Sequence, residues 1–332
     1  MQRSVEKWKR AVIQLECATD SEHHTIRRKR IDEAFKLFAE GKVSHEAVFA
    51  AEATTAMRDV RYHGTAIYVK HDGHRYLITA RHLIWDKDGA KKDFEAAESK
   101  SYPYDLMRKW AIESAAESAS RNVYGIIFRV PSFDELTKGR MPQEFLMNLG
   151  AGTYGRGPYT FSRAHDLAVI SLDIRYSAFA NELDTSGYEA VSSSDFSVGP
   201  DFEGQEIFTV GFPTDMALLG QLSSSSVPPA WSSNDLSLPV TTFGRVSMLH
   251  RELPFFWADM SVYRGNSGGP VVADNHLVGV VTEQATTELE DVEDNIHIQI
   301  PFAKVIKATF ARALLEGQWK KDENRNSLPG GK

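Results

Sequence analysis

Three short segments of the chain carry side chains that together could perform nucleophilic catalysis. A β-rich run ends in His82, an apolar run begins at Asp166, and Ser267 lies within a glycine-rich turn at residues 264–272. A serine hydroxyl is a weak nucleophile and needs a base within hydrogen-bond reach. An imidazole accepts that proton near neutral pH, and a carboxylate orients the imidazole. The residue types therefore predict Ser267 as the nucleophile, His82 as the general base and Asp166 as its orienter.

The glycines around Ser267 predict a bent backbone whose N–H groups converge on one point. A tetrahedral intermediate would place its negative oxygen there, and we expect the N–H groups of Gly265 and Ser267 to bind it. The predicted reaction is acyl transfer to Ser267 followed by hydrolysis, with no metal and no cofactor. A second reading, a metal site at His63, His71 and His74, lacks a cysteine partner or helical His-x-x-x-His spacing.

The elements that must position these residues are mostly short strands. Residues 65–69 and 76–80 flank Asp72-Gly73, which is a strong signal for a β-hairpin. Short strands separated by turns favour barrels over an alternating βα fold. Further strand-like runs cover residues 11–17, 123–130, 167–172, 206–210, 240–248, 255–260, 270–272 and 277–282.

Helical patterns interrupt the strands in two places and follow them in a third. Residues 20–57 and 86–122 read as helical insertions, the first with a second helix capped by Ser44, and residues 302–315 read as a closing helix. Residues 220–239 are rich in Ser and Pro and predict a long loop. The polar tail, residues 317–332, predicts disorder.

The composition limits the classes of function and location. The chain has 332 residues, is 42% hydrophobic and 25% charged, and has a net charge of −7, which argues against general nucleic-acid binding. Cys17 is the single cysteine and cannot form an intrachain disulfide, which fits a reducing compartment. Residues 1–9 are charged and precede no apolar run of signal length. We expect a cytoplasmic protein without membrane association.

The order and context of the three segments resemble the chymotrypsin-fold peptidases. The matching stretches are residues 79–82 (TARH), 166–169 (DLAV) and 265–270 (GNSGGP), supported by residues 210–213, 243–246, 277–280 and 298–301. The resemblance is closest to the bacterial type that includes HtrA-like and other trypsin-like peptidase domains, although no PDZ-like segment follows residue 316. It implies a mostly β fold of two packed six-stranded antiparallel barrels with helical insertions and a C-terminal helix.

The resemblance also implies boundaries for the two barrels. The first would comprise residues 1–19 and 58–185 with insertions at 20–57 and 86–122, and the second residues 186–316 with the closing helix. His82 and Asp166 would come from the first barrel and Ser267 from the second. His82 and Asp166 are 84 residues apart, which is more than in compact members of the family.

The substrate pocket expected from the resemblance is uncharged at its floor. Ser261, six residues before the nucleophile, would form the floor, with Val281, Thr282 and Glu283 as lining residues. This set favours small or apolar residues before the scissile bond. Asn266 stands where trypsin-like zymogens carry an aspartate that pairs with a newly cut amino terminus, so we expect activity without amino-terminal cleavage.

Two other functions and one other orienter stay open at this point. The chain could be a catalytically silent binding or scaffold module with the same fold, or an esterase that uses the same chemistry. Asp173 is a rival to Asp166 as orienter of His82, although it lies at the far end of its strand. The expected partners are a protein or peptide substrate and a regulatory partner docked at the helical insertions.

Overall fold

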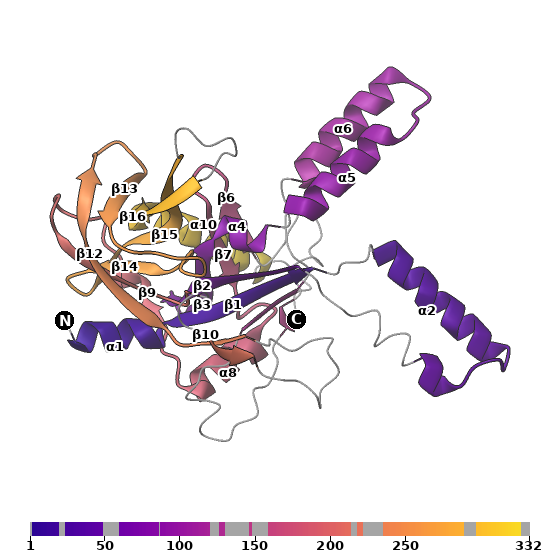
Figure 1. Ribbon diagram of the computed structural model, residues 1–332, viewed down its shortest axis with the longest axis horizontal. Helices are drawn as coiled ribbons and strands as arrows, with labels where there is room; N and C mark the ends of the chain where they lie inside the picture. The colour runs from indigo at the N-terminus through magenta and orange to yellow at the C-terminus, as the bar shows by residue number, and fades with distance from the viewer. Residues whose placement is uncertain are drawn as a thin grey trace.

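Two β-sheets and a C-terminal helix make up the body of the protein in a computed structural model (Figure 1). The structure describes residues 2–19, 24–48, 60–85, 87–119, 126–129, 146–147, 159–213, 218–221, 235–288 and 297–326. The expectation of a mostly β fold with inserted helices and a helix at the C-terminal end is confirmed.

The N-terminal sheet has eight strands in the order β5-β4-β1-β2-β3-β7-β6, with β8 paired to β2. Neighbouring strands on this path are antiparallel, and β8 joins β2 in parallel. The strands are β1 (Val12–Thr19), β2 (Val60–His71), β3 (His74–Ala80), β4 (Ile126–Arg129), β5 (Leu146–Met147), β6 (Tyr159–Ser162), β7 (Leu167–Ser171) and β8 (Val191–Ser192).

The predicted hairpin joins β2 to β3. Asp72 and Gly73 have φ values of 46° and 84°. Two consecutive residues in the left-handed region form the tight turn that matches the twist of the flanking strands. The hairpin register pairs Ala66 with Thr79, so the C-terminal end of β3 lies beside residue 66 of β2. The prediction of this hairpin is confirmed.

The C-terminal sheet is a closed six-stranded barrel in the order β12-β13-β16-β15-β14-β9. Its strands are β9 (Glu206–Gly211), β12 (Val240–Leu249), β13 (Phe255–Asp259), β14 (Pro270–Ala273), β15 (His276–Glu288) and β16 (His297–Lys307). A separate two-stranded sheet pairs β10 (Leu218–Gln221) with β11 (Asp235–Ser237). The segment between β13 and β14 carries the glycine-rich turn.

Helices cover the sheets or extend from them. The helices are α1 (Gln2–Arg10), α2 (His24–Ala39), α4 (Arg81–Ile84), α5 (Lys87–Ser99), α6 (Asp105–Ala119), α8 (Ser177–Ser186), the short 3-10 helix η1 (Ser193–Asp195) and α10 (Ala308–Asn326). Among the described residues, no helix is both long and apolar enough to cross a membrane.

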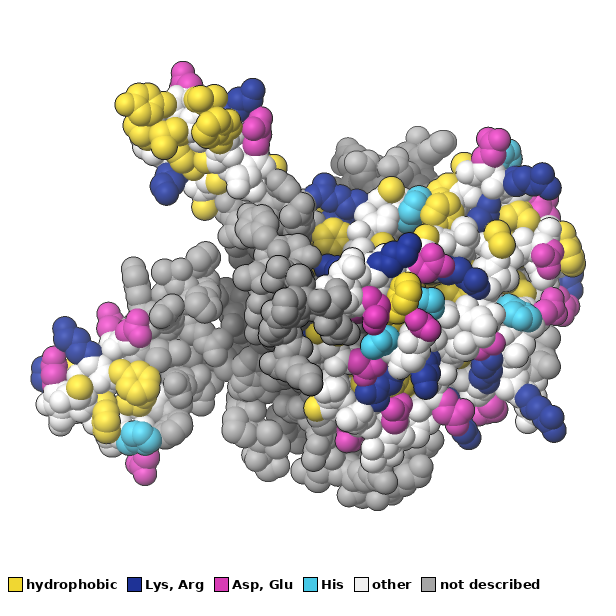
Figure 2. Space-filling model, turned by 180° about the vertical axis from the view of Figure 1, so that it is seen from behind, with side chains coloured by type: hydrophobic (Ala, Val, Ile, Leu, Met, Phe, Trp, Pro, Cys, Tyr) yellow, Lys and Arg dark blue, Asp and Glu magenta, His cyan; other side chains and the backbone are white. Residues whose placement is uncertain are grey.

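The α5–α6 hairpin projects from the sheets (Figure 1), and Figure 2 shows hydrophobic side chains on its surface. On and next to α6, Tyr104, Leu106, Met107 and Trp110 are largely exposed. This hairpin is the second of the two insertions at which we expect a regulatory partner, and that expectation stays a prediction.

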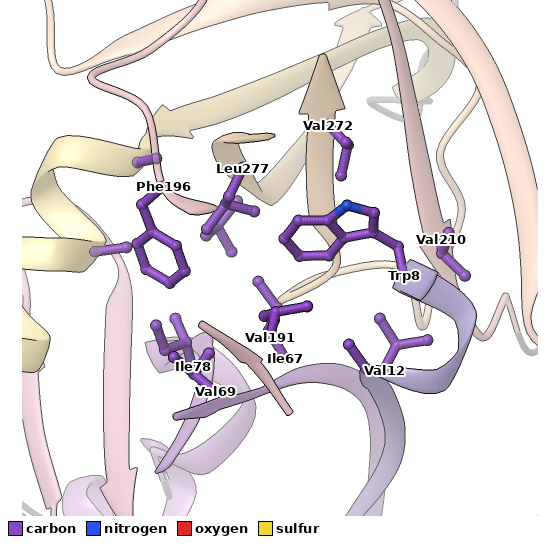
Figure 3. Close-up of a cluster of buried hydrophobic side chains, with 14 of the residues drawn as sticks. Trp8, Val12, Ile67, Val69, Ile78, Val191, Phe196, Val210, Val272 and Leu277 are labelled. Carbon is purple, nitrogen blue, oxygen red and sulfur yellow. The ribbon is translucent and has the colours of Figure 1, made fainter. Parts of the chain in front are cut away.

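Three apolar clusters hold the fold together, and one of them joins the two sheets. Figure 3 shows this cluster, in which Trp8 of α1 and Ile67 of β2 meet Val272 of β14 and Leu277 of β15. Ala311 and Leu315 of α10 belong to the same cluster. The other two clusters lie on the far face of the N-terminal sheet, under α8, and inside the barrel. Burial of apolar surface stabilises a protein by about 25 cal/mol per Å². The shared cluster buries side chains of both sheets and therefore stabilises the packing of one sheet against the other.

Three expectations need correction. The N-terminal sheet is not a six-stranded barrel over its described residues, because β4 and β5, from the long segment between His82 and Asp166, extend it beyond β1. The closing helix begins at Ala308, after β16, and not at residue 302. The helix continues to Asn326, and its Gln318 and Asp322 are buried. The prediction of a disordered tail from residue 317 is therefore wrong for residues 317–326.

Other expectations were met or fall outside the described residues. The Ser44 hydroxyl accepts a hydrogen bond from Ala47 N at 3.3 Å, as expected of a helix cap. The remainder of that second helix, residues 49–57, lies outside the described residues, as do residues 222–234 of the loop expected at 220–239. The described ends of that loop are in part strands, because β10 includes residues 220–221 and β11 covers residues 235–237.

Candidate active site

His82 lies on the one-turn helix α4, which follows β3 directly. Leu83 and Ile84 of this turn are buried, at 4% and 0% exposure, and so anchor it to the sheet. Gly64 of β2 leaves the space for Leu83, because a Cβ at residue 64 would stand 2.1 Å from Leu83 Cδ1. The His82 side chain remains 42% exposed. The sequence thus buries the neighbours of His82 and leaves its imidazole open to solvent.

Asp166 is fixed to the start of α4 by three hydrogen bonds. Its Oδ2 lies 2.6 Å from His82 Nδ1, and its Oδ1 accepts from His82 N at 2.9 Å. Its carbonyl accepts from Arg81 N at 2.9 Å. Asp166 has a φ of 49°, a left-handed conformation that aspartate adopts more readily than most residues. A carboxylate at Nδ1 favours the tautomer with the proton on Nδ1, which leaves Nε2 free to accept one.

Arg81 packs against two aromatic rings beside this pair. Its guanidinium carbon lies 4.2 Å from the ring centre of Trp85 and 5.1 Å from that of Phe161. Arg81 is 9% exposed. Its burial, and to a smaller extent the charge of Arg163, lowers the pKa of Arg81, whereas the charge of Asp166 raises it. A guanidinium stacked on aromatic faces is held in position by cation–π attraction, so Arg81 steadies the turn that carries His82.

Gly265 and Ser267 of the glycine-rich turn have backbone N–H groups that bond to none of the described residues. The N–H groups of Asn266, Gly268 and Gly269 donate to Tyr263 O, Val281 O and Asn266 O at 3.0, 2.8 and 2.9 Å. Within the described part of the chain, the N–H groups of Gly265 and Ser267 have no acceptor. Buried backbone donors are nearly always paired, and Gly265 is buried. Backbone donors of this kind can bind a negatively charged oxygen.

Gly268 brings this turn against the hairpin of the N-terminal sheet. It has a φ of 85°, and a Cβ there would stand 2.0 Å from Thr65 O, 2.4 Å from Thr79 Oγ1 and 3.1 Å from Ala80 N. Ala80 is two residues before His82. Only a glycine allows this approach, which sets Ser267 of one sheet beside the end of β3 of the other.

The structure brings the expected base and orienter into direct contact and sets the expected nucleophile on the adjacent segment. The Ser267 side chain is half-buried. Over the described residues, no hydrogen bond joins the Ser267 hydroxyl to the His82 imidazole. Such bonds are often long in free enzymes and shorten when substrate binds.

The expected pocket residues lie on two sides of the turn. Val281 of β15 bonds to it directly, since its N–H donates to Gly269 O at 2.9 Å and its carbonyl accepts from Gly268 N. Thr282 is buried in a bulge of the β15–β16 pairing. Glu283 is exposed, and its Oε2 lies 3.2 Å from Lys304 Nζ. Ser261 is half-buried between β13 and the turn. The one carboxylate of the set therefore has a cation beside it.

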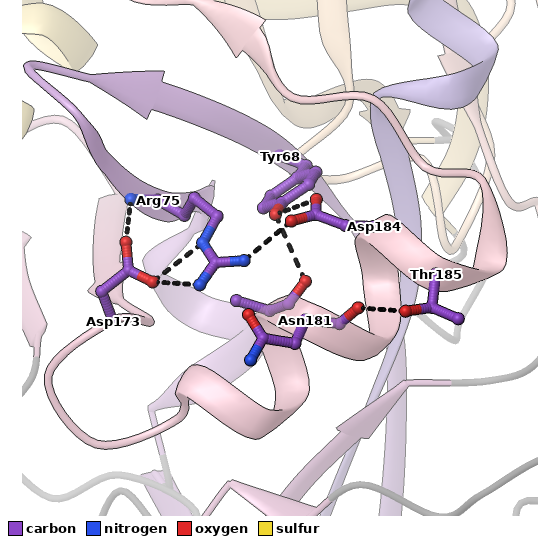
Figure 4. A network of polar contacts seen from close by, with 7 residues as sticks. Tyr68, Arg75, Asp173, Asn181, Asp184 and Thr185 are labelled. Carbon is purple, nitrogen blue, oxygen red and sulfur yellow. Dashed lines mark hydrogen bonds and ion pairs between the residues drawn. The ribbon is translucent and has the colours of Figure 1, made fainter.

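Asp173 belongs to a different network, shown in Figure 4. Its Oδ2 accepts from Arg75 N at 2.7 Å and its Oδ1 from Arg75 Nε at 2.8 Å. Arg75 also donates to Asp184, which accepts from the Tyr68 hydroxyl at 2.7 Å. Asp173 is thus tied to Arg75, and the interpretation of Asp173 as orienter of His82 is wrong.

The three clustered histidines have separate partners. His63 Nε2 lies 3.5 Å from Glu16 Oε2, His71 Nδ1 lies 2.8 Å from Ser193 Oγ, and His74 Nε2 lies 3.3 Å from Glu323 Oε1. Across the described residues, no group of three or more His, Cys, Asp or Glu is arranged to hold a metal ion.

Two residues of this region were not singled out by the sequence. Thr65 and Arg81 both lie inside motifs that were used, one in the hairpin and one in the segment before His82. A charged residue directly before the proposed base was a weak signal for Arg81. No signal existed for Thr65, because the acceptor of its hydroxyl, Gly265 O, is 200 positions away in the sequence.

The comparison with protein families finds a match over more than half of the chain. The family model for a trypsin-like peptidase domain matches residues 64–280, a span that contains His82, Asp166 and Ser267. No curated protein matches the chain.

Three of the solved structures that match the chain have low sequence identity to it. A thermostable serine protease, AL20, from an extremophilic microorganism is 8% identical, with 94% of this chain and 99% of that chain covered and a TM-score of 0.45. The tobacco vein mottling virus protease is 9% identical, with 91% and 78% covered and a TM-score of 0.41. The serine protease domain of the Sesbania mosaic virus polyprotein is 8% identical, with 76% and 85% covered and a TM-score of 0.35.

Proposed function

The chain belongs to the trypsin-like peptidase domain family, and from this premise we propose that it is a serine endopeptidase that forms an acyl-enzyme on Ser267. The observation that carries the proposal is the pair of unused N–H groups at Gly265 and Ser267. They lie in the same turn as the candidate nucleophile, and that turn packs against the strand end that leads to the His82–Asp166 pair.

The proposed reaction has two stages. In the first, His82 Nε2 takes the proton of the Ser267 hydroxyl while Ser267 Oγ bonds to the carbonyl carbon of the substrate. The carbonyl oxygen becomes an oxyanion and accepts from the N–H groups of Gly265 and Ser267. The imidazolium, stabilised by Asp166, then returns its proton to the leaving amine as the C–N bond breaks.

In the second stage water replaces the amine. His82 takes a proton from water, the hydroxide oxygen bonds to the acyl carbon, and the new oxyanion occupies the same two N–H groups. The acyl–Oγ bond breaks, Ser267 regains its proton from His82, and a carboxylic acid product leaves. No metal or cofactor enters either stage of the proposal.

The proposed preference is for small or apolar residues before the scissile bond. Ser261, Val281 and Thr282 are uncharged, and Lys304 next to Glu283 offsets the one negative charge of the candidate pocket. A strong attraction for Arg or Lys would need an unpaired carboxylate at the pocket floor.

We likewise propose, from the lone Cys17, that the protein works in a reducing, cytoplasmic environment.

Covalent labelling with a fluorophosphonate tests the proposal. We expect one adduct per chain by intact mass, located on Ser267 by peptide mapping. The adduct should be absent from Ser267→Ala and His82→Ala, and present in Ser247→Ala, an exposed serine on β12 that serves as the matched control. Folding of each variant is checked by circular dichroism.

The alternatives predict other results. A folded wild type that gives no adduct and cleaves no peptide would contradict the proposal and favour a silent binding module. An adduct on Ser267 combined with hydrolysis of esters but not of a peptide library would favour an esterase.

A further inference from the structure

Thr65 of β2 touches the glycine-rich turn at both residues whose N–H groups are unused. Its Oγ1 donates to Gly265 O at 2.7 Å, and its N–H donates to Ser267 O at 2.9 Å. Thr65 is fully buried, with 0% exposure. One residue of the N-terminal sheet therefore holds the carbonyl groups of the two residues that carry the candidate oxyanion donors.

The direction of the Thr65 hydroxyl proton follows from its other contacts. A threonine hydroxyl has one proton to donate. Phe212 N donates to Thr65 Oγ1 at 3.2 Å, so this contact uses a lone pair of the oxygen. The proton of the hydroxyl is then available for Gly265 O. Thr79 Oγ1 donates to Thr65 O at 2.7 Å and fixes the main chain of Thr65 from the other side.

The backbone of Gly265 receives support from outside the turn. Its φ of 99° lies in a region that glycine enters freely, and it has no side chain to restrict rotation of its peptide groups. The peptide that follows Gly265 is bound at both ends, by Thr65 Oγ1 at its carbonyl and by Tyr263 O at the N–H of Asn266. Without the hydroxyl, the buried carbonyl of Gly265 would lack a donor. Rotation of the peptide between Gly265 and Asn266 to find one would displace the backbone of the turn, which carries the N–H groups of Gly265 and Ser267 on either side of that peptide.

From this geometry we infer that Thr65 is a positioning residue that aims the oxyanion-binding N–H groups from the opposite sheet. It touches neither substrate nor reacting atoms and acts through Gly265 and Ser267. The inference rests on the proposed peptidase function for its kinetic consequences. Its structural consequence, the orientation of the Gly265 carbonyl, does not depend on activity.

The test compares variants that remove or keep the hydroxyl. Thr65→Val has nearly the same shape without a donor, Thr65→Ser keeps the donor, and Thr65→Cys offers a weak one. Thr160→Val is the matched control, because it removes another threonine hydroxyl bond, the one from Thr160 Oγ1 to Gln318 Oε1 at 2.6 Å, away from the turn.

We expect kcat of Thr65→Val to fall about 10- to 100-fold with KM changed less than about threefold, since the lost orientation matters only once the oxyanion forms. Affinity for a peptide aldehyde should fall with kcat, Thr65→Ser should recover most of both, and Thr65→Cys should lie between. Thr160→Val should match the wild type in kcat after correction for folded fraction. A role confined to stability would lower the melting temperature and leave kcat per folded molecule unchanged, which would overturn the inference.

A crystal structure of Thr65→Val gives the readout that is independent of activity. We expect the Gly265 carbonyl to have turned from its place beside residue 65, and an unmoved carbonyl would overturn the inference. If Thr65→Val does not fold, Thr65→Cys supplies the same comparison. A wild type that neither labels nor cleaves would contradict the proposed function, while the crystal structure would still decide the role of Thr65.

Discussion

Replacing Gly268 by alanine tests whether the contact between the two sheets sets the geometry of the nucleophile turn. The added Cβ would stand 2.0 Å from Thr65 O and 2.4 Å from Thr79 Oγ1. Carbon and oxygen need well over 3 Å, so the turn would have to withdraw by about 1 Å or more. Neither obstacle is the end of a flexible side chain, because one is main chain and the other is hydrogen-bonded to it.

Two costs add up in this variant. An alanine in the left-handed region costs about 1–2 kcal/mol, and overpacking a tight contact costs about 1–3 kcal/mol. We therefore expect Gly268→Ala to lose about 2–5 kcal/mol of unfolding free energy. A displacement of about 1 Å of a reacting group costs about 100-fold in rate, and labelling by fluorophosphonate should slow accordingly.

Gly187→Ala separates the two costs. Gly187 has a φ of 93°, close to the 85° of Gly268, but a Cβ there would meet nothing within 4 Å. This variant should lose about 1–2 kcal/mol and label at the wild-type rate. Urea denaturation gives the stabilities and stopped labelling reactions give the rates. If Gly268→Ala were no less stable than Gly187→Ala and labelled equally fast, the proposed coupling between the sheets would be refuted.

Three further changes test other parts of the molecule. Asp166→Asn should lower kcat about 10³- to 10⁴-fold with little change in KM, since an amide favours the wrong tautomer of His82; steady-state kinetics would contradict this if kcat fell less than tenfold. Arg75→Met should cost about 1–3 kcal/mol, because Asp173 loses charge-assisted bonds, yet labelling should be unchanged; slower labelling would reopen a catalytic role for Asp173. Burial, and then the charge of Glu16, raise the pKa of Cys17, so the thiol stays protonated in the folded protein while the unfolded thiol ionises above about pH 8.5. The contribution of the protonated Cys17 thiol to the free energy of unfolding is thus present below that pH and lost above it, by about 1.4 kcal/mol per pH unit. In urea titrations at pH 7 to 10, Cys17→Ala should therefore lose less unfolding free energy with rising pH than the wild type.

The parts of the fold that the sequence predicted are those set by local patterns. The β2–β3 hairpin follows from Asp72-Gly73 between two β-branched runs, and the turn at 264–272 follows from its glycines. The start of α10 was not readable, because buried residues continue from Ala303 and Val305 of β16 into Ala308 and Ala311 without a glycine or proline at the boundary. A continuous hydrophobic pattern with no glycine or proline does not indicate where a strand ends and a helix begins.

The extent of the N-terminal sheet depended on pairings that a single sequence does not encode. β4 is four residues long and joins β1 from more than a hundred residues away, with Cys17 opposite Ile127. The helix α1 also carries no strong signal, although its Trp8 is fully buried in the cluster between the sheets. Both features depend on tertiary contacts that override local preference.

The candidate site shows the same division between local and non-local information, and this division bears on how its activity is controlled. His82 and Asp166 are bonded to each other within one sheet, so that pair keeps its geometry whatever the other sheet does. The turn with Ser267 belongs to the barrel but receives two bonds from Thr65 and the close contact of Gly268 from the N-terminal sheet. A small shift of one sheet over the other would therefore disturb the oxyanion donors before it disturbed the base. Any partner or insertion that moved the sheets would act on transition-state binding, and its kinetic signature would be a change in kcat with little change in KM.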